Sequence, residues 1–178
     1  MNRSPGSISI PTGLAGLAKT IAEANHRDEI FAAVADMADT HVGHKLFTVM
    51  AFDAETMQVR RLYSSDSASY PPGGAKAKRD TDWGRHVLEQ GRPFIGRHAD
   101  DIRASFDDYE VIFGLGLGSV LNVPVRVCGQ TIGTMNLLNV AEFYDDSDLD
   151  WGYILAGQLV GPLCVENGLP TRRLENRD

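Results

Sequence analysis

Two asparagines lie inside segments whose composition predicts β-strands, and they are the polar residues with the clearest chemical potential. Asn122 falls within SVLNVPVRV and Asn136 within TIGTMNLLN, with Thr134 two residues before the second amide. Asparagine is disfavoured in strand interiors, and a buried amide must be hydrogen-bonded. These side chains therefore either orient a bound ligand or fix a segment of the chain that covers the sheet.

A second group of candidates is mainly aromatic and lies between residues 65 and 118. Ligand pockets are lined mostly by apolar and aromatic side chains with a few polar groups, and this segment offers both kinds. We expect its side chains to line a ligand pocket or, alternatively, to form only a small core of their own. The candidates are Trp83, His86, Phe94, Phe106, Tyr109 and Phe113.

Basic residues also gather in this segment, although the whole chain has a formal net charge of −7. Arginine binds carboxylates and phosphates through paired hydrogen bonds, so the cluster would suit an anionic ligand. The alternative is a solvated surface in which these residues alternate with aspartates. The residues are Lys76, Lys78, Arg79, Arg85, Arg92, Arg97 and Arg103. No basic stripe with stacking aromatics accompanies them, which argues against a nucleic-acid partner.

Other site chemistries find little support in the sequence. His41 and His44 have a spacing that metal ligands on a helix can have, but no carboxylate or cysteine motif completes a set. The two cysteines, Cys128 and Cys164, are too few for a disulfide scaffold or a thiolate zinc site. No serine lies in a nucleophile elbow. We therefore predict no catalytic residue, no metal and no cofactor.

Composition and length restrict the class of protein. The chain has 178 residues, of which 43% are hydrophobic, and this suits one globular domain. The acidic balance argues against binding to nucleic acid or to anionic lipid. No apolar run is long enough to span a membrane, and the N-terminus lacks the apolar core of a signal peptide. We expect a cytoplasmic protein with a flexible lead-in over 1–11, a domain over 12–167 and a polar tail over 168–178.

Hydrophobic periodicity gives the elements that would position these residues. Residues 65–80 are predicted to be irregular. The predicted helices cover 12–25, 28–42 and 81–90, short helical turns cover 100–106 and 108–113, and a last helix is capped by Ser147. The predicted strands cover 45–53, 58–64, 93–95, 119–127 and 131–139.

Alternation along the last two strands predicts a sheet with two different faces. Leu121, Val123 and Val125 share one face of their strand, and Asn122 lies on the other. In the partner strand, Ile132, Thr134, Asn136 and Leu138 are predicted to share the polar face. A three-residue hairpin loop would place Asn122 opposite Asn136, whereas a two-residue loop would place it opposite Met135.

The order of short motifs in the C-terminal half resembles that of the GAF domain family, whose members are small-molecule sensors. The matching segments are Ser119–Val125 (SVLNVPV), Gly129 followed by Ile132-Gly133-Thr134, Tyr144-x-x-x-Asp148-Leu149, and Ala156-Gly157-Gln158. The resemblance covers about residues 12–167. It implies an α+β fold of the PAS/profilin-like kind: an antiparallel sheet of five or six strands, terminal helices on one face, and a ligand-covering segment on the other.

The resemblance also allows this sequence to be compared with the branches of the family that are enzymes or bind known ligands. Free methionine-R-sulfoxide reductases of this family use cysteines around the region that is here 106–118, and this chain has none there. The pocket or upstream cysteine that attaches bilins is also missing, and the cyclic-nucleotide signature survives only at Asn139 and Asp148.

The leading hypothesis is therefore a sensor that binds an unidentified organic small molecule and acts through an effector protein or a homodimer. A dimer would pair through Leu14, Leu17, Leu159 and Leu163. One alternative is an enzyme of unknown reaction in the same pocket, with His86 as acid or base because histidine titrates near neutrality. The other is a ligand-free dimerisation or scaffold module.

Overall fold

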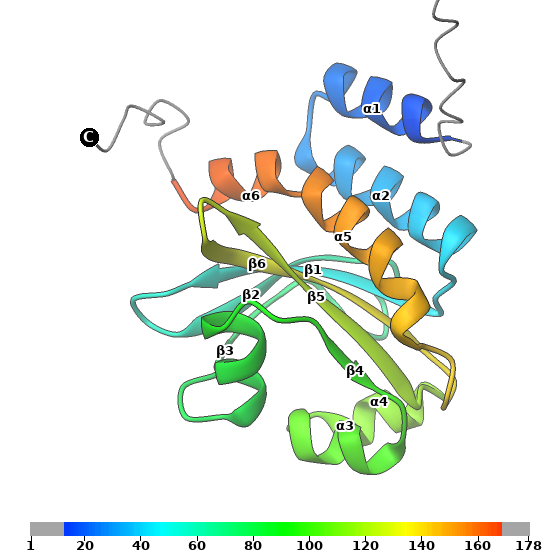
Figure 1. Ribbon diagram of the computed structural model, residues 1–178, viewed down its shortest axis with the longest axis vertical. Coiled ribbons are helices and arrows are strands. Elements are labelled where there is room, and N and C mark those ends of the chain that lie inside the picture. The colour runs from blue at the N-terminus through cyan, green and yellow to red at the C-terminus, as the bar shows by residue number, and fades with distance from the viewer. Residues whose placement is uncertain (1–12, 169–178) are drawn as a thin grey trace, which may run out of the picture.

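The computed structural model describes residues 13–168, so the expected lead-in and nearly all of the expected tail lie outside it. A six-stranded antiparallel sheet with strand order β3-β2-β1-β6-β5-β4 forms its centre (Figure 1). The strands are β1 (Leu46–Asp53), β2 (Gln58–Ser64), β3 (Gly73–Ala77), β4 (Phe94–Gly96), β5 (Ser119–Val127) and β6 (Gln130–Asn139). The predicted fold class is confirmed.

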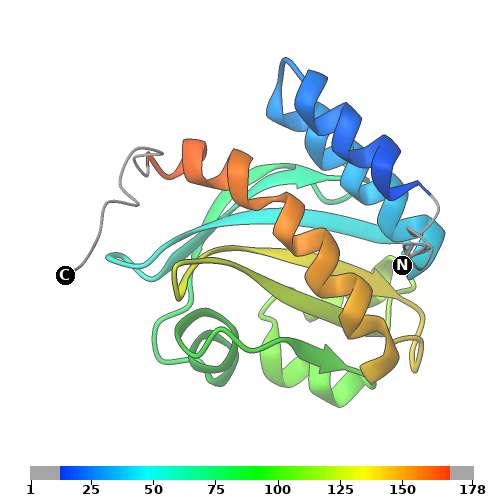
Figure 2. The same ribbon diagram turned by 45° about the horizontal axis from the view of Figure 1, so that its top comes forward.

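Terminal helices cover one face of the sheet, as Figure 2 shows from above. Their apolar side chains, among them Phe31, Leu155 and Leu163, form a core with Leu121, Val123 and Val125 of β5. Every second residue of β5 is apolar and points to the face that the helices cover. Burial of this apolar surface is the main favourable contribution to folding. The helices are α1 (Leu14–Glu23), α2 (Arg27–His41), α5 (Leu149–Gln158) and α6 (Val160–Glu166).

The leucine seam expected between two copies of the chain is wrong for three of its four residues, whereas Leu14 is half-buried. Leu17 is 4% exposed, and Leu159 and Leu163 are fully buried in the helix-side core. These three leucines therefore pack against the sheet of their own chain. Their side chains are not exposed and cannot contact a second copy.

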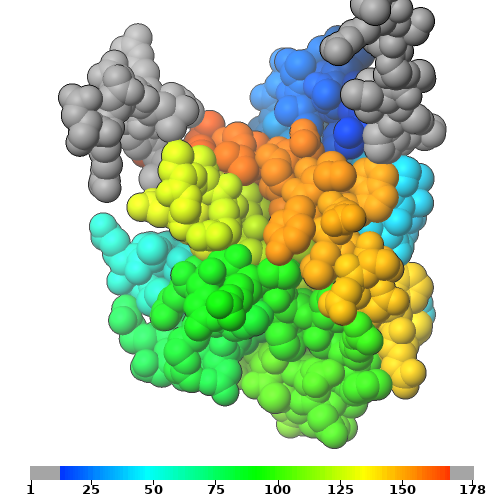
Figure 3. All heavy atoms as spheres, in the orientation of Figure 1, coloured from blue at the N-terminus to red at the C-terminus, as the bar shows by residue number. Residues whose placement is uncertain are grey.

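The other face is covered by a roof, which we define as residues 65–118 apart from strands β3 and β4. It contains the π-helical segment η1 (Gly84–Glu89), α3 (Ala99–Ser105) and α4 (Tyr109–Gly114). Thr81 caps the helical turn that leads into η1, because its hydroxyl accepts a hydrogen bond from the Gly84 amide at 2.9 Å. In Figure 3 the atoms of this green part of the chain lie in a continuous layer.

One part of the region expected to be irregular is a strand. Residues 73–77 form β3, which pairs with β2 through Lys76 opposite Val59 and Ala75 opposite Arg60. The segment GGAKA has few of the β-branched and aromatic residues that mark strands, so its pairing with β2 decides its conformation.

The β5–β6 hairpin combines a two-residue turn with a shifted register. Cys128 and Gly129 both have positive φ, 49° and 80°, as a type I′ turn requires. Val127 pairs with Gln130, but beyond Val125 the pairing moves by one residue and places Asn122 opposite Asn136. Ile132 is the residue skipped in the pairing. It packs in the helix-side core, so its predicted place on the polar face is wrong.

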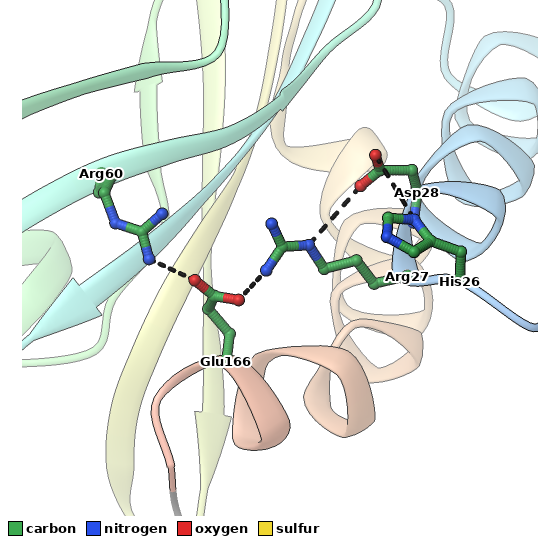
Figure 4. A network of polar contacts seen from close by, with 5 residues as sticks. All are labelled: His26, Arg27, Asp28, Arg60 and Glu166. Carbon is green, nitrogen blue, oxygen red and sulfur yellow. Dashed lines mark hydrogen bonds and ion pairs between the residues drawn. The ribbon is translucent and has the colours of Figure 1, made fainter.

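The end of α6 is held by ion pairs to two other elements (Figure 4). Glu166 accepts hydrogen bonds from Arg27 at the start of α2 and from Arg60 of β2. The next residue, Asn167, donates its side-chain amide to the carbonyls of Phe52 at 3.3 Å and Ile132 at 2.8 Å. The last helix is thus tied to β1, β2 and β6 as well as to the core.

Among residues 13–168, none of the helices combines the length and the hydropathy needed to span a bilayer.

Candidate functional site

A small cavity lies between the sheet and the roof. Its volume is about 40 Å³, which is room for water-sized molecules only, since one water needs roughly 10–15 Å³ on the same measure. Organic ligands of drug size occupy clefts of about 300–1,000 Å³. The apolar part of its wall is formed by Met50, Val59, Phe106, Ile112, Val120 and Leu138.

A chain of buried hydrogen bonds crosses the floor of this cavity. The indole Nε1 of Trp83 donates to Asn122 Oδ1 at 2.9 Å. Asn122 Nδ2 donates to Asn136 Oδ1 at 2.8 Å, and Asn136 Nδ2 donates to the Thr48 hydroxyl at 3.1 Å. Both asparagines are almost fully buried, at 2% and 3% exposed. The strand amides therefore satisfy one another and attach the roof through Trp83, while their side chains still line the cavity.

Four ionisable residues form the opposite wall. Lys76 Nζ lies 2.7 Å from Asp108 Oδ2, and the Tyr70 hydroxyl donates to the same carboxylate at 2.5 Å. Asp108 directly precedes α4, so these contacts join the start of α4 to β3 and to the loop before β3. Lys78 also lines the cavity and is only 5% exposed.

Burial and hydrogen bonding shift the pKa values of three of these groups. Burial lowers the pKa of the Lys78 ammonium, and burial together with the bond to Asp108 raises the pKa of the Tyr70 hydroxyl. Burial also tends to raise the pKa of Asp108, but the hydrogen bonds from Lys76 and Tyr70 outweigh it, so this pKa lies below its usual value. The roof is therefore held by an ionised carboxylate.

We expect Asp108→Asn to cost about 2 kcal/mol of unfolding free energy at pH 7, the range for hydrogen bonds to charged groups. Because the folded-state pKa of Asp108 is depressed, this contribution exists above the unfolded pKa of about 4 and is lost as the pH falls through the lower folded value. Urea denaturation at pH 7 and pH 3 measures the change, with Asp100→Asn as the exposed control. Equal differences between wild type and Asp108→Asn at both pH values would contradict it.

The sequence-predicted site residues divide into two groups. Asn122, Asn136 and Trp83 meet at the cavity, and Thr134 shares the face of Asn136 but lies outside the cavity lining. The Thr134 hydroxyl is buried and has no hydrogen-bond partner within residues 13–168.

The remaining candidates lie elsewhere in the roof and, for Phe94, in β4. His86 Nε2 is 2.9 Å from the Pro93 carbonyl, and together with Phe94 it borders shallow hollows on the outer surface. The rings of Tyr109 and Phe113 contact one another at a tilt of 56° with centroids 5.9 Å apart, and both pack against the apolar cluster that contains Ile112. An acid–base role for His86 in the roofed cavity is thus not supported by its position.

Sequence reasoning missed Tyr70 and Asp108, and it named Lys76 and Lys78 only as members of a broad basic cluster. One signal was available: Lys76 and Lys78 are two residues apart, the spacing that places side chains on one face of a strand. The position of Asp108 carries no comparable local signal, because its contacts come from residues more than thirty positions away.

A larger depression of about 640 Å³ lies at the far end of the sheet and is an open groove. It is bordered by the β1–β2 turn, the β6 end of the hairpin and the end of α6, with Asp53, Glu55, Arg60 and Glu166 among its residues. Within the described part of the chain, no group of three or more His, Cys, Asp or Glu side chains is placed to hold a metal ion.

Comparison with known proteins adds a family and a set of similar folds. The family model described as the GAF domain matches residues 24–160. No curated protein matched the chain in sequence.

Solved structures give the likeness in three dimensions. The GAF domain of a two-component sensor histidine kinase from Bacillus halodurans has a TM-score of 0.65 at 18% identity, covering 82% of this chain and 97% of that one. The GAF domain of Acinetobacter phosphoenolpyruvate-protein phosphotransferase has a TM-score of 0.69 at 12% identity, covering 86% and 92%. A domain of a putative two-component sensor histidine kinase from Sinorhizobium meliloti 1021 has a TM-score of 0.62 at 18% identity, covering 85% and 99%. At these identities the likeness concerns the fold.

Proposed function

Because this chain belongs to the GAF domain family, whose members are small-molecule-binding sensor domains of signalling proteins, we propose that it binds a small organic molecule without a covalent link. The ligand would occupy the roofed cavity between the sheet and residues 65–118. Its signal would pass to an effector protein or through a dimer of the chain.

One observation carries this proposal: the cavity is enclosed by buried polar groups that also hold the roof. Trp83 and Asp108 are roof residues whose hydrogen bonds end on the sheet and on Lys76. At about 40 Å³ the closed cavity excludes a metabolite, so binding would require the roof to move outward. A ligand that favours the open roof would then shift the population between the two states.

Hydrogen exchange tests the proposal. It is measured on the purified full chain, with and without compounds from a metabolite library. A bound compound should change the exchange protection of the roof, above all near Trp83 and at residues 106–114, while α2 stays unchanged. Native mass spectrometry of the same sample should show the added mass. Unaltered protection in the roof with every compound would contradict ligand sensing at this cavity.

The small volume favours a second candidate, a ligand-free scaffold module. In that case apolar side chains such as Phe106 and Ile112 simply form the core beneath the roof. Such a module should show no added mass in native mass spectrometry, and it should form a complex whose stability does not depend on small molecules.

A further inference from the structure

The charges that line the roofed cavity do not balance. Lys76 and Lys78 contribute two ammonium groups, and Asp108 contributes the only carboxylate among the lining residues that the structure describes. Asp108 is engaged by Lys76 at 2.7 Å. The cavity wall therefore has one positive charge in excess, on Lys78.

Lys78 has no close anionic partner to compensate for its burial. The nearest carboxylate within residues 13–168 is that of Asp107, whose Oδ2 is 3.9 Å from Nζ and whose side chain is 87% exposed. Ion pairs with solvated carboxylates contribute little, so the free-energy cost of burying the Lys78 ammonium is compensated only weakly. The Trp83 ring centroid lies 5.5 Å from Nζ, and the charges of Asp108 and Lys76 also act on Lys78, with opposite signs.

The rest of the wall indicates what kind of anion would fit. Apart from the amide chain and the four ionisable residues, the lining is apolar. Because the closed cavity of about 40 Å³ must enlarge by movement of the roof to admit any organic ligand, a short ligand requires the smallest movement. A second negative charge on the ligand would face Asp108 or the apolar wall, and both would be unfavourable.

We propose that the roofed cavity binds a short-chain aliphatic monocarboxylate, whose carboxylate pairs with Lys78 and whose hydrocarbon chain lies against the apolar wall. This inference rests on the proposed function and specifies the ligand class for the same site. The ligand supplies the one missing negative charge, and because the closed cavity of about 40 Å³ is too small for it, it binds the state in which the roof has moved outward.

The test uses sodium butyrate as the probe, with butyramide as its neutral counterpart and succinate as a dianion, at constant ionic strength. The chain has two tryptophans, so the full-length Trp151→Phe variant leaves Trp83 as the single indole reporter beside Lys78. We expect butyrate to change the Trp83 emission in a saturable manner and to raise the unfolding midpoint. Butyramide and succinate should bind at least tenfold more weakly.

Two variants separate binding from folding. Lys78→Met should weaken butyrate binding at least tenfold without lowering the unfolding midpoint, because an apolar side chain replaces a buried unpaired charge. Asp107→Asn should strengthen binding about twofold, since it removes a competing carboxylate near Lys78. The matched controls are Lys19→Met, on an exposed side chain, and Asp100→Asn, and neither should alter binding.

The outcomes distinguish this inference from the proposed function. If butyramide binds as tightly as butyrate, or if Lys78→Met binds butyrate normally, the anion inference is wrong while ligand sensing stands. If inorganic phosphate binds as tightly as butyrate, the carboxylate class is wrong. If all of these probes leave Trp83 unchanged, the anion inference is overturned, and the exchange experiment with the metabolite library decides on ligand sensing separately.

Discussion

Gly133→Ala is expected to destabilise the fold by about 3 kcal/mol or more, at the upper end of overpacking effects. Gly133 lies in β6 between two partners, opposite Val125 of β5 and Ala51 of β1. A Cβ at this position would lie 2.3 Å from the Met50 carbonyl oxygen and 2.8 Å from a Leu163 methyl carbon. The nearest obstacle is backbone of a central strand, so rotation of a side chain cannot relieve the clash.

Urea denaturation monitored by circular dichroism measures this loss, and Gly157→Ala is the matched control. Gly157 lies in α5 and is exposed, and a Cβ added there would point into open space. Alanine favours helix over glycine, so this control should gain about 0.5 kcal/mol. If Gly133→Ala lowers the free energy of unfolding by less than about 1 kcal/mol, β1 and β6 can separate there at little cost, which would contradict the prediction.

Asn136→Leu is expected to cost about 3 kcal/mol of unfolding free energy. Asn136 is the middle of the buried chain, accepting from Asn122 and donating to Thr48. Leucine has a similar size but no polar atoms, so the Asn122 amide loses its acceptor inside the protein. An unsatisfied buried donor bears the full cost of lost hydration.

A double-mutant cycle isolates this coupling. In Asn122→Leu with Asn136→Leu, neither amide remains to be left unpaired, so the double variant should lose at least about 1 kcal/mol less than the sum of the single losses. Urea denaturation of the four proteins gives the cycle. Additive losses would mean that the two amides do not depend on one another.

The sequence predicted the fold best where local pattern and long-range packing agree. Alternation in β5 placed Leu121 and Asn122 on opposite faces, and the structure shows them in the helix-side core and the roofed cavity. The same reasoning failed for Ile132, because a register shift in the partner strand interrupts strict alternation. It also failed for β3, whose glycines and lysine are poor strand formers and which is fixed by pairing with β2.

The candidate site was predictable only in part, for a similar reason. Asn122 and Asn136 stood out because asparagine is disfavoured in strand interiors, and Trp83 stood out because ligand pockets are lined mostly by apolar and aromatic side chains. Tyr70 and Asp108 were not identified, because their importance comes from a contact between residues 38 positions apart. For Leu159 and Leu163 the sequence predicted a contact that the structure does not support. A stripe of leucines at helical spacing suits either a dimer interface or an internal core, and only the burial of the side chains distinguishes the two.

Because of the register shift at Ile132, the alignment of Asn122 with Asn136 depends on the number of residues between each asparagine and the turn. The two-residue turn alone would place Asn122 opposite Met135. The one residue skipped in the pairing places Asn122 opposite Asn136 instead. Deleting the skipped Ile132 would remove the shift and leave Asn122 opposite Asn136. Deleting one residue of β5 between Asn122 and the turn would instead place Asn122 opposite Met135 and exchange the hydrophilic and lipophilic sides of the distal ribbon. Related chains in which both amides meet should therefore either keep the skipped residue or have one residue fewer in β6 between the turn and the second amide.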